Sequence, residues 1–240
     1  MKERNMGKQT LLVVGAAGNV GRGIVAAALA SGRNVVAAEL KDEWLGDLKK
    51  HHQGEAFAGV TGNVSTEAGA TALWEAARAP FGGVDHVVIS VNVPVRLRPL
   101  MEFDAAELTQ VLAGNVVTHF VAAKTFLPRM PSHGVLIGIG GGTADFIFPQ
   151  QAHISMGQAA TRMMYKGVAK EVKSGAQAHE LMIISMVATD ANRDIAQPDW
   201  VTNVEVGQHI CAIFDAPEKF PKPVLHLRSK AQVGSPEPQA

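Results

Sequence analysis

The sequence predicts a single α/β domain built on a Rossmann-type, doubly wound parallel sheet. Short apolar runs alternate with longer helical stretches along the 240 residues, and the runs are apolar on both faces. Strands of this kind, separated by crossover helices, are typical of a parallel sheet that is covered on both sides. Ligands of such sheets bind beyond the carboxyl ends of the strands, so we expect function in the loops that follow them.

The predicted elements follow one another in a regular order. Strands are expected at residues 10–14, 34–38, 84–91, 134–139, 181–187 and 224–227, with one more, third in chain order, ahead of Asn63. Helices are expected at residues 21–30, 67–77, 104–130, 154–173 and 200–214. The domain therefore spans residues 10–227, after an extension at 1–9. The tail at 228–240 contains Ser235-Pro236-Glu237-Pro238, and we expect it to be disordered unless a partner subunit holds it.

The bulk composition excludes several classes of partner. The 22 basic and 22 acidic side chains balance, which leaves no electrostatic footprint for nucleic acid or for an anionic membrane. The single cysteine, Cys211, excludes an internal disulfide framework and fits a reducing cytoplasm. No run is apolar enough for a secretion signal or a membrane span. The balanced charge therefore favours a small-molecule substrate. The histidines, including His51 and His52, lack metal-ligand spacing, so we expect no metal.

A glycine-rich turn after the first strand indicates nucleotide binding. The turn opens a helix rich in alanine, and its binding candidates are Gly15, Ala17, Gly18, Asn19, Val20 and Gly21. Glycine here lets the backbone turn tightly and approach a pyrophosphate, whose charge is met by the amides and the positive dipole of the helix start. The alternative is a glycine-rich turn without a ligand. The position between a strand and a helix, with an acidic residue after the second strand, favours the dinucleotide.

Glu39, at the end of the second strand, predicts NAD rather than NADP. Its carboxylate can accept hydrogen bonds from both hydroxyls of the adenosine ribose, whereas a 2′-phosphate would bring like charges together. At about 4 Å and an effective dielectric constant near 20, each such pair costs about 4 kcal/mol. Arg33 and Lys41 lie close enough in sequence to weaken this preference, but we expect both to be surface charges. Asn63 and Val64 are candidates to bracket the adenine, the alternative for Asn63 being an ordinary turn residue.

Taken together, these residues resemble the short-chain dehydrogenase/reductase family from about Thr10 to Leu227, with a glycine spacing closer to its extended or atypical members. The segment from Ile89 through Ser90 and Val91 to Asn92 looks like the turn that follows the family's fourth strand, which implies cofactor contacts there. Asn115 matches the asparagine that holds a water in the family's proton relay. The resemblance also implies long helices that pair subunits, so we expect a homodimer or homotetramer.

The proton-transfer part of the resemblance is altered. Gly140 stands where the family's strand ends in a catalytic serine, and thirteen residues further His153 stands in place of the tyrosine, with Gly157 in place of the lysine. The Pro-Gly turn after the sixth strand is replaced by Thr189-Asp190. The chain's one tyrosine, twelve residues beyond His153, is about 18 Å further along the same helix. We therefore expect Tyr165 to serve packing or an interface.

His153 is the candidate acid or base. A histidine titrates near pH 6.5 without help from a lysine, and a helix start favours its neutral form. The alternative is a histidine that only lines a pocket or caps a helix. Thr143 can supply a hydroxyl in place of the serine, the alternative being a polar residue that only satisfies the backbone of the glycine-rich loop. Asp145 is a candidate to orient His153, with surface solvation as its alternative, and Ser155 and Asp190 are further polar candidates.

Two hypotheses follow. In the first, the chain is an atypical NAD-dependent oxidoreductase that moves a hydride between nicotinamide and a small carbonyl or alcohol, with His153 as acid/base, Asn115 as water holder and the backbone of residues 140–142 as donors to a developing oxyanion. In the second, the chain is a redox-inactive dinucleotide-binding scaffold or sensor, or a lyase or isomerase. Fold analogy does not choose between them, because one fold hosts many functions.

Overall fold

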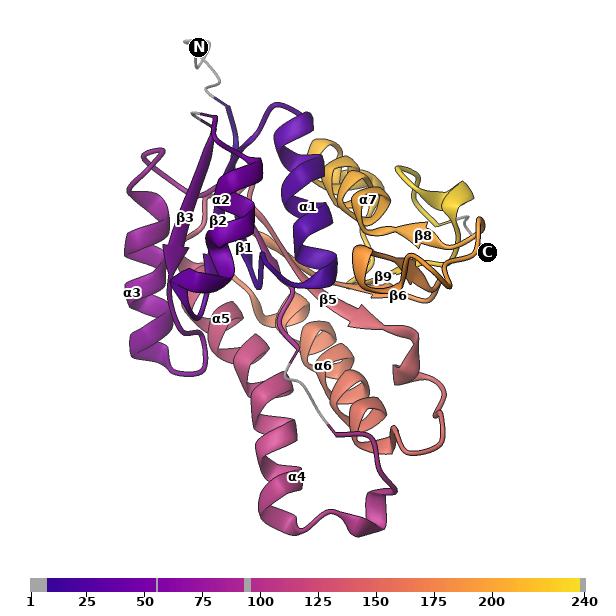
Figure 1. Ribbon diagram of the computed structural model, residues 1–240. Coiled ribbons are helices and arrows are strands. Elements are labelled where there is room, and N and C mark those ends of the chain that lie inside the picture. Colours follow the sequence, from indigo (N-terminus) through magenta and orange to yellow (C-terminus); the bar gives the residue numbers. More distant parts are fainter. Residues whose placement is uncertain (1–7, 55, 93–95, 238–240) are drawn as a thin grey trace.

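The computed structural model describes residues 8–54, 56–92 and 96–237. Within them, seven parallel strands form one sheet in the order β3-β2-β1-β4-β5-β6-β9 (Figure 1). The strand order reverses between β1 and β4, so the sheet is doubly wound about that point. The predicted fold class is confirmed.

The strands and helices of the described residues have the following bounds. The sheet contains β1 (Thr10–Val14), β2 (Asn34–Glu39), β3 (Phe57–Thr61), β4 (His86–Ile89), β5 (Val135–Gly141), β6 (Gln177–Ile183) and β9 (Val224–Leu227). The helices are α1 (Asn19–Ala30), α2 (Gly46–His51), α3 (Glu67–Arg78), α4 (Ala105–Leu112), α5 (Thr118–Phe126), α6 (Ala152–Glu171) and α7 (Asn203–Asp215). Short 3-10 turns include η1 (Asp42–Leu45), η5 (Gly142–Ala144) and η8 (Lys230–Gln232).

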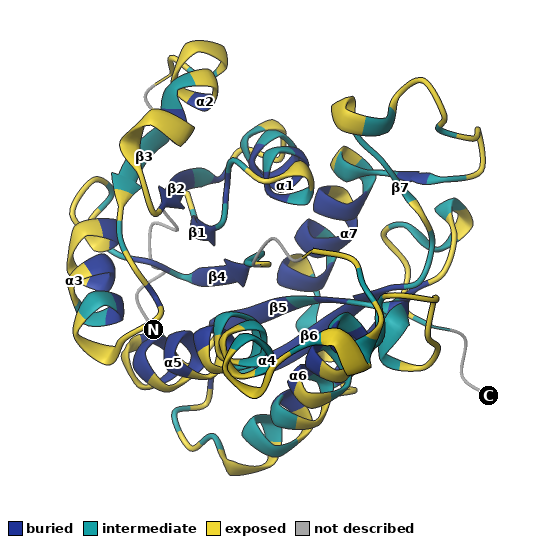
Figure 2. Cartoon of the chain, turned by 60° about the horizontal axis from the view of Figure 1, so that its bottom comes forward, coloured by how far each residue is buried: buried dark blue, intermediate teal, exposed yellow. Residues whose placement is uncertain are grey.

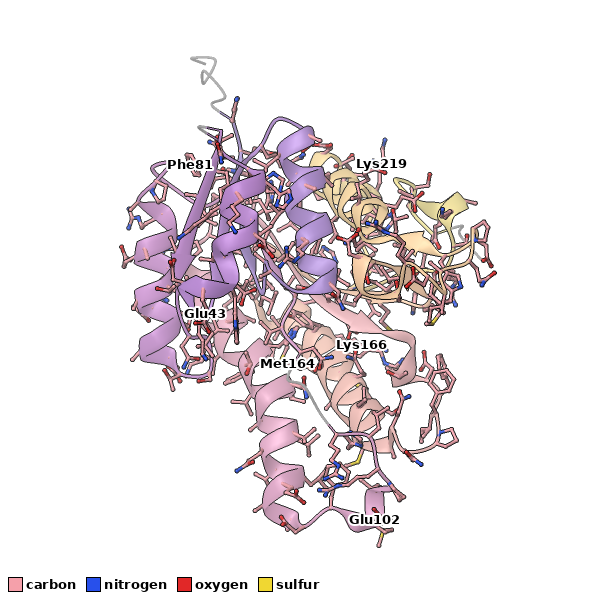
Figure 3. The ribbon with its side chains drawn as sticks, viewed as in Figure 1. Glu43, Phe81, Glu102, Met164, Lys166 and Lys219 are labelled. Atoms are coloured by element: carbon pink, nitrogen blue, oxygen red, sulfur yellow. The ribbon has the colours of Figure 1, made fainter. Side chains whose placement is uncertain are left out.

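Two helical layers cover the sheet, as the alternation of buried side chains requires. Leu11 and Val13 of β1 pack with α1 and α7, whereas Leu12 and Val14 pack with α3 and α5 on the opposite face. Figure 2 shows the buried strands in dark blue between these layers. The helix α4 extends from the second layer, with Glu102 at the outer tip of the lobe it forms (Figure 3).

Two elements that the sequence predicts as continuous are divided in the structure. The predicted helix at 104–130 is divided by a π-helical turn, Ala113–Val117, which contains Asn115. The predicted strand at 181–187 is two strands: β6 ends at Ile183, and β7 (Val187–Ala188) pairs instead with β8 (Val201–Thr202) in a small second sheet. A helix start at residue 104 is explained by its capping box, in which Asp104 and Glu107 each bond the other's backbone amide.

The prediction that Arg33 is a surface charge is wrong. Its side chain is 6% exposed, forms an ion pair with Asp215 at the end of α7, and lies over the Phe214 ring. The ion pair joins the segment after α1 to the end of α7, and no local sequence pattern indicates such a contact. Lys41, in contrast, is exposed and pairs with Glu43.

The C-terminal segment is packed against the domain as far as it is described. After β9 the chain forms η8, and Glu237 accepts a hydrogen bond from Lys222 Nζ at 3.0 Å and pairs with His226. These contacts hold the pKa of Glu237 below its ordinary value, against the opposing effect of burial. Within the described residues, the tail thus places its own carboxylate against two basic side chains. Among the described residues, no helix has the length and apolar character that a membrane span needs.

Candidate functional site

A cleft of about 740 Å³ opens at the carboxyl ends of β1, β2, β3 and β4, beside the point where the strand order reverses. Its volume is that of a typical site for a cofactor. The residues that line it come from the glycine turn, from the segments after β2, β3 and β4, and from the π-helical turn and α5: Val14, Gly15, Ala17, Gly18, Arg22, Ala38, Glu39, Leu40, Glu43, Trp44, Asp47, Gly62, Asn63, Val64, Ser65, Ser90, Val91, Asn92, Gly114 and Thr118.

The glycine turn forms one wall of this cleft. Gly15 has a φ of +81°, which side chains with a Cβ rarely adopt, and a Cβ there would lie 2.4 Å from the Ser90 carbonyl oxygen. Gly18 precedes α1 and lines the cleft, where a Cβ would meet only the Gly15 carbonyl oxygen, at 3.3 Å. No side chain caps the start of α1. The geometry thus leaves room for a phosphate at the helix N-terminus.

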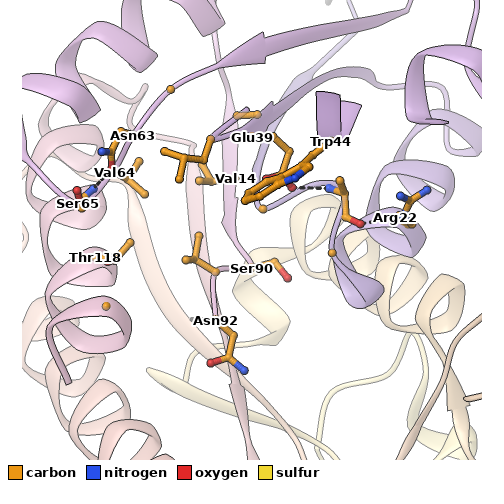
Figure 4. A pocket seen from close by; sticks show the side chains of 18 of the residues that line it. Val14, Arg22, Glu39, Trp44, Asn63, Val64, Ser65, Ser90, Asn92 and Thr118 are labelled. Atoms are coloured by element: carbon orange, nitrogen blue, oxygen red, sulfur yellow. Dashed lines mark hydrogen bonds between the residues drawn. The ribbon is translucent and has the colours of Figure 1, made fainter. Parts of the chain in front are cut away.

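Glu39 lies beside the glycine turn. Its carboxylate is mostly buried, with the residue 8% exposed, and Oε1 accepts a hydrogen bond from the Ala17 amide at 2.6 Å (Figure 4). The bond ties the end of β2 to the turn after β1 and fixes the carboxylate in the wall of the cleft. Two further acidic side chains, Glu43 and Asp47, line the same region, whereas Arg22, the one cation among the described lining residues, is paired with Asp47 at 3.5 Å. This part of the cleft is therefore acidic.

Two segments face each other across the cleft beyond Glu39. Asn63 and Val64 follow β3, and the Asn63 Oδ1 accepts a hydrogen bond from the Ser65 amide at 2.8 Å, so Asn63 also stabilises its own turn. On the other side, the half-exposed indole of Trp44 in η1 lies next to Glu39 (Figure 4). Sequence reasoning missed Trp44, because a tryptophan in a 3-10 turn carries no motif.

A second, much smaller recess adjoins the cleft at Val91 and Asn92. Its volume is about 10 Å³, close to the space for one water molecule. One side of the recess is lined by four residues of α6: Ile154, Gly157, Gln158 and Thr161. Asn115 of the π-helical turn and His119 of α5 also line the recess. Asn115 donates from Nδ2 to the Val111 carbonyl at 2.8 Å. The recess is thus where the structure brings Asn115 and the middle of α6 together.

The structure places His153 outside the residues that line this recess. His153 is fully buried near the start of α6, with its ring 4.6 Å from that of Phe103. Neither ring nitrogen has a hydrogen-bond partner among the described residues. Burial, and secondarily the charge of Arg98, lowers the pKa of the imidazole, so the neutral form predominates at pH 7.

Ile154 and Gln158 are the residues that sequence reasoning missed here. The strand β5 ends at Gly141, one residue beyond Gly140, and thirteen residues from Gly141 lead to Ile154. Gln158 Oε1 accepts a hydrogen bond from the Gly141 amide at 2.7 Å, which uses one of the backbone donors expected for an oxyanion. The helical spacing 154, 157, 158 and 161 was the available signal, since these positions share one face of a helix.

The other polar candidates are spread around this region. Thr143 lies in η5, after β5, and does not line the cleft or the recess. Asp145 pairs with Arg162 of α6. Ser155 donates to the Phe146 carbonyl at 3.1 Å, and Asp190 pairs with Arg193 on the surface. Each has a local structural partner except Thr143, for which the structure gives no side-chain contact that explains it.

A buried polar chain runs behind the recess. The Tyr165 hydroxyl lies 3.2 Å from His119 Nδ1, and His119 Nε2 lies 3.2 Å from the Val91 carbonyl oxygen. Tyr165 is fully buried in the core, as its packing role predicts. Burial lowers the pKa of His119 to about 4 and raises that of Tyr165. Glu180 of β6 is also fully buried, and burial raises its pKa to about 8.

Comparison with known proteins gives the family. The model for short chain dehydrogenases matches residues 9–200. The chain belongs to the short chain dehydrogenase family. It is similar to a short chain dehydrogenase/reductase of Macrophomina phaseolina, with 26% identity over 58% of this chain and 84% of that protein. It is also similar to 4-formylbenzenesulfonate dehydrogenase of Comamonas testosteroni, with 28% identity over 70% of this chain and 68% of that one.

The same fold is found among solved structures. The structure of ElxO with NADP bound superposes with a TM-score of 0.80, over 92% of this chain and 97% of that one, at 16% identity. At this identity the likeness shows the fold alone. Members of the family bind a nicotinamide dinucleotide, either NAD or NADP, and are oxidoreductases.

Proposed function

We propose that this chain binds NAD in the cleft and moves a hydride between the nicotinamide ring and a small carbonyl or alcohol substrate. The observation that carries the proposal is the meeting of three features at one cleft: the glycine turn, the uncapped start of α1 and the carboxylate of Glu39. The first two suit a pyrophosphate, and the third suits two ribose hydroxyls.

The acidic end of the cleft favours NAD over NADP. A 2′-phosphate on the adenosine ribose would meet Glu39, with Glu43 and Asp47 in the same wall. Arg22 also lines the cleft, but its guanidinium group already donates a hydrogen bond to the Ala17 carbonyl and pairs with Asp47. Each uncompensated pair of like charges costs about 4 kcal/mol at about 4 Å. Relatives that bind NADP therefore do not decide the cofactor of this chain.

His153 is the proton-transfer group in this proposal. Bound NAD supplies the hydride acceptor, so the chain must take up or deliver the accompanying proton. A buried imidazole without a hydrogen-bond partner is costly, and such groups persist where a ligand completes the bond. His153 directly precedes Ile154, which lines the recess, and displacement of the Phe103 ring would expose it to substrate. Its lowered pKa keeps it a base at neutral pH.

Calorimetric titration of the purified chain tests the cofactor assignment. NAD is expected to bind at least about tenfold more tightly than NADP. A tenfold difference corresponds to about 1.4 kcal/mol, which is less than half of the cost of about 4 kcal/mol for one pair of like charges. Glu39→Gln should narrow that difference, and the exposed Glu171→Gln on α6 serves as the matched control. Equal affinities of the wild type for NAD and NADP would contradict the assignment.

A second function, dinucleotide binding without hydride transfer, is favoured by one observation. Among the described residues that line the recess, His119 is the one titratable side chain, and both of its nitrogens are already hydrogen-bonded. Ile154 and Gln158 cannot transfer a proton. If the reaction centre is this recess and not the surroundings of His153, the chain binds the cofactor but has no side chain in place to transfer the proton.

One set of variants separates the two functions. With a panel of alcohols and carbonyl compounds, formation or loss of the reduced cofactor is followed by absorbance. His153→Phe should lower a wild-type rate by about 10²- to 10⁴-fold and leave NAD affinity unchanged. An inactive wild type that becomes active as Ile154→Tyr with Gln158→Lys would support the redox-inactive function. The matched pair His153→Tyr with Gly157→Lys tests the other helical register.

A further inference from the structure

His119 is a buried histidine whose hydrogen bonds define its protonation state. The Val91 carbonyl oxygen can only accept a hydrogen bond, so Nε2 of His119, 3.2 Å away, must carry the proton. With the imidazole neutral, Nδ1 is then an acceptor, and the Tyr165 hydroxyl, 3.2 Å away, must donate to it. Burial keeps the imidazole neutral, since it lowers the pKa of His119 to about 4.

Among the described residues, the Tyr165 hydroxyl has no hydrogen-bond partner other than His119. Tyr165 packs its ring and hydroxyl against the backbone of Gly138, where a Cβ would lie 2.3 Å from the hydroxyl oxygen. Its ring stands edge-on to that of His119, and both residues are almost completely buried. Glu180, on β6 beside Gly138, influences the pKa of Tyr165 through its charge, but neither of its oxygens has a hydrogen-bond partner among the described residues.

The hydrogen-bonded series from Tyr165 through His119 reaches the candidate site at Val91. Val91 lines both the cleft and the recess, and it precedes Asn92, which lies away from Glu39 in the cleft (Figure 4). Glu39 marks the adenosine end in the proposed function, so Val91 and Asn92 lie where the nicotinamide end belongs. The segment after β4 leaves the sheet at Ile89, and the bond from His119 on α5 is the side-chain contact that the structure gives the Val91 carbonyl.

We propose that Tyr165 and His119 act together as positioning residues: the tyrosine hydroxyl selects the Nε2–H tautomer of His119, which holds the Val91 carbonyl and so sets the wall against which the nicotinamide end of the dinucleotide rests. The proposal rests on the proposed NAD binding for its ligand, but the tautomer is a property of the free protein. Neither residue belongs to the turn, the carboxylate or the acid/base group described above.

The tautomer is tested without ligand. ¹⁵N NMR of histidine-labelled protein distinguishes Nε2–H from Nδ1–H imidazole, and the His119 signals are those that His119→Gln removes. The wild type should show a single neutral Nε2–H tautomer from pH 6 to 8. Tyr165→Phe should give a mixture of tautomers. An Nδ1–H or charged His119 in the wild type would overturn the proposal whatever the protein binds.

The ligand effect is tested by calorimetry with three probes: NAD, AMP and nicotinamide mononucleotide. Tyr165→Phe and His119→Leu should weaken NAD and the mononucleotide by about 5- to 10-fold, the value of one hydrogen bond, and leave AMP within about twofold. His119→Gln should restore affinity, because its amide can donate to Val91. Thr125→Val, which removes a buried hydroxyl from the same helix α5, is the control and should change none of the three affinities.

Besides the tautomer result, three outcomes of the calorimetry would overturn the proposal. Equal losses for AMP and NAD would mean a general effect on the fold, and unchanged NAD affinity in both Tyr165→Phe and His119→Leu would mean no positioning. If Tyr165→Phe does not fold, failure of His119→Gln to bind better than His119→Leu decides against it. A wild type that binds neither NAD nor AMP contradicts the proposed function itself, and this is seen before any variant is made.

Discussion

Glu180 gives the sharpest prediction about stability, because its carboxyl group is buried and has no hydrogen-bond partner among the described residues. The residue is fully buried on β6, and a Cβ on the neighbouring Gly140 would lie 2.2 Å from its Oε1. Burial raises its pKa from the ordinary 4.5 to about 8, although Arg162 and Lys166 on α6 lower it, and Asp145 raises it further. At neutral pH the folded protein therefore holds a proton on Glu180 that the unfolded chain releases.

The sign and size of the effect follow from linkage. Below pH 4.5 both states are protonated, and the group adds no pH dependence. From there to about pH 8 unfolding releases a proton, so the free energy of unfolding falls by about 1.4 kcal/mol for each pH unit. Over the whole interval the loss is about 5 kcal/mol, an upper value since relaxation around a buried charge reduces it. Above about pH 8 the contribution is constant.

Urea denaturation at several pH values between 5 and 9 measures this slope. Glu180→Gln keeps the shape of the side chain and removes its titration, so its free energy of unfolding should fall less steeply with pH than that of the wild type. The exposed Glu171→Gln on α6 is the matched control and should follow the wild type. Parallel curves for wild type and Glu180→Gln would refute the reasoning, because they would mean that the carboxyl titrates as it does in water.

Three other predictions concern the cleft and the surface. Gly18→Val should abolish NAD binding while circular dichroism still reports a folded protein, because the added side chain extends from the turn where the cleft opens; retained binding would place the nucleotide elsewhere. Trp44 fluorescence should be quenched by NAD, and a signal change that persists in Trp44→Phe would come from Trp74 or Trp200 instead. Light scattering should find a homodimer or homotetramer, since Phe120 and Met163 expose apolar surface on α5 and α6; a monomer at micromolar concentration would contradict this.

The sequence by itself determined the fold class and the glycine turn and acidic residue that line the cleft. These features are encoded by contiguous residues: apolar strands buried on both faces, a glycine with positive φ after β1, and an acidic residue at the end of β2. Each is a local requirement of backbone geometry or of charge, so it is legible in one stretch of chain. The start of α4 is likewise determined locally, because the capping box that fixes it lies within four consecutive residues.

Only the tertiary structure decided which side chains reach the recess and which are buried. On a helix, a shift of one residue turns a side chain by about 100°, so the choice between His153 and Ile154 depends on how α6 packs against β5 and the π-helical turn. The burial of Arg33 depends on Asp215, far away in sequence, and the burial of Glu180 depends on Gly140 of β5, where a side chain would collide with the carboxyl group. Such contacts join residues from distant elements, and the energy that selects them comes from packing the assembled layers and not from any local pattern.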